Sequence, residues 1–252
     1  MWWHRSKSLQ LIADRQALHV FVRERGRYRL LESPLLGAFA PAELSLAIAA
    51  VLQAHRPTDL TVALSWDWAP GVVVDFGVSG LPAKAHQAHA HARMREIFGA
   101  VADDWQVVTD AQRVNGPQCV FGVPRACIAA VTDNARALRI RRCRVEPALG
   151  WSWRVGALRD LRDGWWLIDH GASLTVVLVG EHLPRQIDHV FMGGGSTTPS
   201  MQEHLARLAL RHGVTNALAM PHAVCIAHPA SAAAPSGARV VDPLMILTDG
   251  DA

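Results

Sequence analysis

The residues best suited to chemistry lie between positions 165 and 195, where an aspartate, a glycine and two hydroxyl side chains follow an apolar run. Asp169 would hold a magnesium-bound water, and the backbone after Gly171 would approach the phosphates of a nucleotide. Ser173 and Thr175 would donate hydroxyl hydrogen bonds to the same phosphates. This spacing is typical of one half of a nucleotide site.

A glycine run follows the same segment, at the distance where a glycine-rich loop would lie beside a nucleoside. Its members are Gly193, Gly194 and Gly195. A hairpin turn followed by ordinary strand residues explains the shorter Asp-x-Gly motif as well, because short glycine motifs are weak evidence alone. The added glycine run favours common ancestry with nucleotide-binding proteins, and both interpretations of the motif stay open.

The N-terminal segment contains a possible counterpart of this motif. Asp14 is present, but Gln16 stands where an Asp-x-Gly pattern needs glycine, and no hydroxyl residue follows. A side chain at that position blocks the close approach of the backbone to a phosphate. We therefore expect a degenerate nucleotide site, and no pair of side chains suggests a general base for hydrolysis.

A histidine cluster is the other candidate site. His86, His89 and His91 form a His-x-x-His-x-His pattern on a predicted helix. A helical two-ligand metal site uses positions i and i+4, and no acidic partner stands beside these residues. We expect a solvated helix face and no metal site.

Composition narrows the function classes further. The 252 residues are 50% hydrophobic and 19% charged, which favours a well-packed globular protein. The formal net charge is only +3 and the basic residues are dispersed, so no nucleic-acid partner is expected. The four cysteines form no Cys-x-x-Cys pair, which favours reduced thiols in the cytoplasm. No apolar run reaches the roughly 18 residues that a membrane span needs, so membrane contact is expected only through partners.

Hydrophobic periodicity predicts a repeated order of three strands, a helix and a further strand. The predicted strands are residues 9–22 (a pair), 28–32, 60–65, 105–109, 119–123, 140–146, 165–168, 174–179 and 185–191, with one more following residues 216–220. The predicted helices are residues 41–55, 82–100, 124–138, 147–158 and 201–212. This order predicts two related α/β half-domains, residues 1–150 and 151–252.

Residues 9–195 resemble the PilM family of type IV pilus assembly proteins and the related cytoplasmic domain of the type II secretion protein GspL. Three segments carry the resemblance, followed by the Asp169–Thr175 motif, Arg185 and the glycine run. The segments are residues 62–65, 91–127 and 137–151.

The resemblance implies an actin-like fold of two ribonuclease-H-like domains, each a mixed sheet flanked by helices. It also implies a cytoplasmic scaffold at the inner face of the inner membrane. Members of the PilM family bind the N-terminal cytoplasmic tail of a membrane assembly protein in a cleft of the first domain. They can bind ATP and contact the assembly ATPase.

The chain departs from this family in two respects. It is shorter, which implies trimmed insertions, and its first phosphate loop lacks the glycine, which makes it more like the GspL type. We therefore expect a non-enzymatic scaffold without a required cofactor. The alternative is an actin-like ATPase that retains an ATP-Mg site at Asp169, Gly171 and the glycine run.

Overall fold

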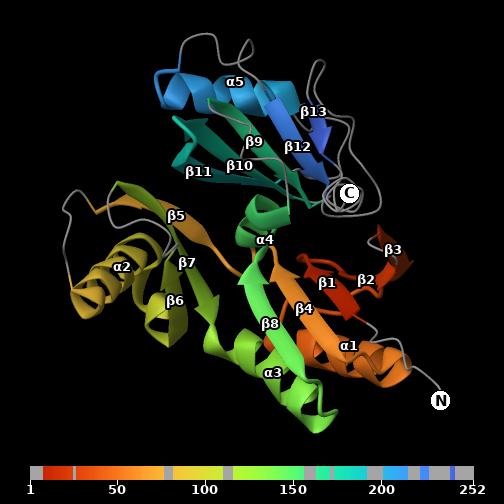
Figure 1. Cartoon of the computed structure of the whole chain (residues 1–252). Coiled ribbons are helices and arrows are strands. Elements are labelled where there is room, and N and C mark those ends of the chain that lie inside the picture. The colour runs from red at the N-terminus through yellow and green to blue at the C-terminus, as the bar shows by residue number, and fades with distance from the viewer. Residues whose placement is uncertain are drawn as a thin grey trace.

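The computed structural model describes residues 8–24, 27–76, 82–109, 116–155, 163–170, 173–191, 201–214, 222–226 and 239–241. In this part of the chain the strands form three sheets, each with helices on one face (Figure 1). We call them the first sheet, the insert sheet and the second sheet. None of the described helices combines the length and the apolar character needed to cross a membrane.

The first sheet has the strand order β3-β2-β1-β4-β8. Strands β1, β2 and β3 form an antiparallel meander, and β4 and β8 join β1 in parallel. Helices α1 and α3 lie side by side under one face (Figure 1). The bounds are β1 Ser8–Ala13, β2 Leu18–Glu24, β3 Arg27–Glu32, α1 Pro41–His55, β4 Asp59–Leu64, α3 Arg125–Ala137 and β8 Arg142–Pro147.

Side-chain alternation explains why this sheet is covered on both faces. Leu9 and Leu11 of β1 pack with the helices, at Ile48 and Val131 among others, while Ile12 faces the opposite side. Strands buried on both faces need nearly continuous apolar runs, which is what β1 and β4 contain.

An insertion between β4 and α3 forms the insert sheet, with the order β5-β7-β6. Helix α2 packs on it through Ala90 and Met94, which contact a cluster that includes Trp105. The bounds are β5 Gly71–Asp75, α2 Ala83–Phe98, the 3₁₀ helix η1 Gly99–Asp104, β6 Trp105–Thr109 and β7 Pro117–Pro124.

The second sheet, β11-β10-β9-β12-β13, repeats the topology of the first sheet. Three antiparallel strands are again followed by a helix and two parallel strands, and α5 covers the sheet through Leu205 and Leu208. The bounds are β9 Gly164–Asp169, β10 Ser173–Gly180, β11 Leu183–Phe191, α5 Met201–Arg211, β12 His222–Ile226 and β13 Arg239–Val241.

The three sheets meet in a central apolar cluster around the short helix α4, Ala148–Val155, which lies between them in Figure 1. Trp151 of α4 is 1% exposed. The cluster contains Ile12 of the first sheet, Phe121 of the insert sheet, and Trp166 and Ile168 of the second sheet. The face of each sheet that its own helices leave uncovered is therefore buried at a common centre.

The predicted α/β class with mixed sheets flanked by helices is confirmed, as are the predicted strands and helices within a few residues. Strands β5 and β13 were not predicted, and the expected trimming of insertions stays a prediction. The boundary near residue 150 stays a prediction, and α4 lies across it.

Replacing Trp151 by alanine tests the role of the central cluster. Removal of a buried tryptophan leaves a cavity shared by all three sheets, so the free energy of unfolding should fall by about 3–5 kcal/mol. Urea denaturation measures this change. Leu46→Ala, at a side chain 66% exposed on α1, is the control and should change the free energy by no more than about 0.5 kcal/mol. A similar small effect in Trp151→Ala would contradict the proposed role.

Candidate functional site

Two equivalent hairpins, β1–β2 and β9–β10, carry most of the predicted site residues. In each, four residues separate the paired positions Ala13–Leu18 and Asp169–Leu174. The amide of Asp14 donates to the carbonyl of Ala17, and the amide of His170 donates to that of Ser173. Asp14 therefore corresponds to His170, and Ala13, the last residue of β1, corresponds to Asp169, the last of β9. The sequence-based pairing of Asp14 with Asp169 is wrong by one residue, because a short motif carries no information on hairpin register.

The carboxylate of Asp14 occupies the amides of its own loop. Its Oδ1 accepts from the backbone N–H of Gln16 at 2.6 Å and of Ala17 at 2.7 Å, and its Oδ2 lies 2.8 Å from Nε2 of His19. Burial raises the pKa of Asp14, but the bonds from His19 and the two amides outweigh it, so the pKa is lowered overall. The donors that a phosphate would need at this loop are thus already used by an anion of the protein.

A second carboxylate, that of Asp67, joins the two halves. Its Oδ1 lies 3.8 Å from Nη1 of Arg15 in the first half and 3.8 Å from Nε2 of His189 in the second. Its Oδ2 accepts from the hydroxyl of Ser173 at 3.4 Å. The pKa of Asp67 is lowered overall, since the contributions of His189, His170 and Arg15 outweigh the effect of burial.

Aromatic rings surround this ion pair on both sides. Trp66, next to Asp67, stacks on the ring of His189 with centroids 5.5 Å apart. The guanidinium of Arg15 lies 5.3 Å from the ring centroid of Phe39 and 5.8 Å from that of Phe191. Cation–π and stacking contacts of this kind reinforce the contact between β11 and the loops of the first half.

His170 is a fully buried histidine at the same junction. It is 2% exposed, its Nε2 lies 3.3 Å from the hydroxyl of Thr175, and its Nδ1 has no hydrogen-bond partner among the described residues. Burial, together with the nearby charge of His189, lowers the pKa of His170 to about 4, although Asp14 and Asp67 act in the opposite direction. The ring is therefore neutral at pH 7.

The residues described above meet at one junction, which we call the polar junction and which includes Asp67, His170 and His189. The predicted site residues that lie in it are Asp14, Asp169, Ser173 and Thr175. All four are buried. Gly171, Gly193, Gly194 and Gly195 lie outside the described residues. The described residues do not fit ATP-Mg, because the first-loop amides bind Asp14 and the hydroxyl of Ser173 binds Asp67.

Three residues of the junction were missed by sequence reasoning: Asp67, His170 and His189. Asp67 stands between two tryptophans just after β4, Trp66 and Trp68, and belongs to none of the motifs that the sequence analysis considered. A charged residue at the carboxyl end of a parallel strand is a signal that could have identified it, since such ends converge on ligand sites.

The histidine-bearing face of α2 is solvated only in part. The ring of His86 stacks on Phe76, with centroids 3.8 Å apart, so this histidine packs rather than pointing freely into solvent. His89 is exposed. No group of three or more potential ligands that could hold a metal ion occurs within the described ranges.

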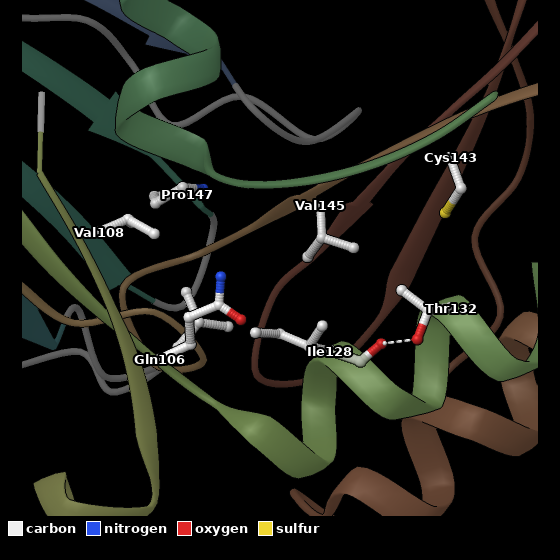
Figure 2. Close-up of a pocket in the computed structure, with 8 residues that line it drawn as sticks. Gln106, Val108, Ile128, Thr132, Cys143, Val145 and Pro147 are labelled. Carbon is white, nitrogen blue, oxygen red and sulfur yellow. Dashed lines mark hydrogen bonds between the residues drawn. The ribbon is translucent and has the colours of Figure 1, made fainter. Parts of the chain in front are cut away.

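A separate pocket of about 210 Å³ lies between the insert sheet and the edge of the first sheet (Figure 2). We call it the β6–β8 groove. Its wall on β8 consists of Cys143, Val145 and Pro147, and Ile128 and Thr132 of α3 form its floor. The remaining lining residues come from β6 and β7: Gln106, Val108 and Val123.

No family model matches this sequence, and no curated protein matches it. Similar solved structures do exist. The first is the cytoplasmic domain of EpsL, an inner-membrane component of the type II secretion system of Vibrio cholerae, with a TM-score of 0.55 and 16% identity over 96% of this chain and 92% of that one.

Two further structures are similar. A protein from Bacteroides thetaiotaomicron with an actin-like ATPase fold has a TM-score of 0.57 and 7% identity, covering 90% of this chain and 83% of that one. A chain of the PilM–PilN type IV pilus biogenesis complex has a TM-score of 0.53 and 16% identity, covering 84% of this chain and 67% of that one. The expected actin-like fold is thereby confirmed, and identities this low establish the fold alone.

Acid should weaken the folded state through His170. Its pKa is about 4 in the folded protein and near 6.5 when unfolded, so only the unfolded chain takes up the proton between these values. The free energy of unfolding should therefore fall as pH drops from about 6.5 to 4, by up to about 3 kcal/mol. Urea denaturation at several pH values measures this slope. The slope should be smaller in His170→Gln, and an unchanged slope would contradict the assignment.

Nucleotide binding is the property that best separates the two interpretations of the junction. A titration with a fluorescent ATP analogue and magnesium should give no saturable signal, because Asp14 and Asp67 occupy the donors that phosphates need. Saturable binding by the wild type that is lost in Asp169→Ala would overturn this expectation and support the ATPase alternative.

Proposed function

We propose that this protein is a non-catalytic cytoplasmic scaffold of a bacterial inner-membrane assembly platform, of the type II secretion or type IV pilus kind. It binds the N-terminal cytoplasmic tail of a membrane protein and is recruited to the membrane by it. The β6–β8 groove is the observation that carries this proposal. Resemblance to the EpsL domain and to the PilM–PilN complex supports it.

The groove suits an extended peptide better than a small molecule. Its volume of about 210 Å³ is below the roughly 300–1,000 Å³ of pockets that enclose drug-sized ligands. The lining is mainly apolar, with Gln106 and Thr132 as its uncharged polar residues. A few apolar side chains of a peptide would fill this space, while the rest of the peptide lay across the surface.

The polar junction does not compete for this role. Its carboxylates are paired within the protein, and its contacts hold the two halves together rather than exposing a site. A scaffold of this kind needs no nucleotide to hold its shape. We also propose that the chain divides into two related units at about residue 150. In addition, we propose that the protein contacts an assembly ATPase.

A photocrosslinker attached to Cys143 tests the partner. Cys143 is exposed in the groove, whereas Cys119 and Cys127 are buried, and a Cys225→Ser background removes the remaining thiol. Labelled protein is incubated with inner-membrane vesicles of the same bacterium, irradiated and analysed by mass spectrometry. The expected adduct is the N-terminal cytoplasmic tail of an inner-membrane protein.

A control moves the thiol away from the groove. In Cys143→Ser/Leu210→Cys the label lies on α5, at a side chain that is 83% exposed and does not line the groove, so capture of the tail should fall severalfold. Equal capture by both proteins, or adducts with peptides that are not cytoplasmic tails, would count against the groove as the binding site.

A further inference from the structure

The outer edge of β8 has two features that together identify the kind of segment it can bind. It is the last strand of the first sheet, and in the part of the chain that the structure describes no strand pairs with its outer side. The β6–β8 groove lies beside this edge, as Figure 2 shows. An exposed sheet edge offers a row of backbone donors and acceptors to an added strand.

Side chains on β8 alternate between two environments. Cys143, Val145 and Pro147 face the groove. Arg142 and Arg144 therefore belong to the other face, and both are exposed.

These two arginines are poorly compensated. In the register of β4 and β8, Arg142 stands beside Asp59, with its Nε 4.0 Å from the carboxylate and its side chain 88% exposed. Arg144 stands beside Thr61, and no ion-pair partner for it occurs among the described residues. Farther along the same face is Glu146, which has an interaction of its own. The positive charge is thus concentrated at the first half of the edge.

We propose that the partner segment of the scaffold function joins the first sheet as an extra strand beside β8, and that it alternates apolar and acidic residues. Its apolar side chains fill the groove over Ile128 and Val145. Its acidic side chains lie opposite Arg142 and Arg144. This inference rests on the proposed function and specifies the chemistry of the partner at the same site.

Short labelled peptides test the charge rule by fluorescence polarisation. A seven-residue peptide of alternating valine and glutamate should bind about tenfold more tightly than its valine–lysine counterpart. Opposite charges on neighbouring strands attract, whereas like charges repel. The preference should reverse in Arg142→Glu/Arg144→Glu. The matched control is Arg139→Glu/Arg141→Glu, which changes the charge equally just before β8 and should leave the preference in place.

Backbone pairing is tested separately with the same peptide carrying N-methyl groups at alternate amides. In an added strand, alternate amides point toward β8 and away from it. Methylation of the amides that point toward β8 should therefore abolish binding. Equal affinity for both charge patterns, no binding of the valine–glutamate peptide, or tolerance of methylation at both sets of amides would each overturn the inference. If a membrane protein tail still crosslinks to Cys143 in that case, the scaffold function stands and only this mode of recognition fails.

Discussion

The burial of Trp151 and its neighbours fixes the positions of all three sheets. A fully buried tryptophan removes roughly 200 Å² from water, which corresponds to about 5 kcal/mol at the usual coefficient. The surface ion pair of Arg15 with Asp67 contributes far less, because the arginine side chain is half exposed. The apolar cluster therefore sets the distance between the halves, and the polar contacts at the junction adapt to it.

This constraint explains the chemistry of the junction. Because the halves are held together by apolar packing, Asp14 and His170 are buried and Asp67 is partly buried where the packing places them, and each must adopt a charge state that its surroundings stabilise. Asp14 does so by binding the amides of its own loop, and His170 does so by losing its proton. A bound nucleotide would have to break these internal hydrogen bonds before its phosphates could accept bonds from the same donors. The junction is thus better suited to holding the halves together than to exchanging a ligand.

Periodicity predicted most of the fold because alternation and helical spacing are local properties. Strand β5 was not predicted because it is short and lies between a proline-containing loop and Phe76. Its pairing with β7 joins Gly71 to Phe121, fifty positions along the chain, and such a contact leaves no local pattern. The site was harder to predict for a related reason. Asp14 and Asp169 resemble each other as motifs, but backbone hydrogen bonds align Asp14 with His170. Neither Asp67 nor His189 belongs to a motif, since only tertiary packing brings them together.

The insert sheet places the proposed binding surface away from the polar junction. By placing β6 opposite β8, it creates a groove beside an edge strand, and edge strands are hazardous because they also pair with copies of themselves. Arg142 and Arg144 reduce that hazard in pairings of two β8 copies that place these arginines opposite one another, since like charges then meet. An acidic partner strand is attracted by the same two residues. Protection against self-association and selection of a partner thus depend on one charge pattern, as expected where specificity arises from repulsion of the wrong partner as much as from attraction of the right one.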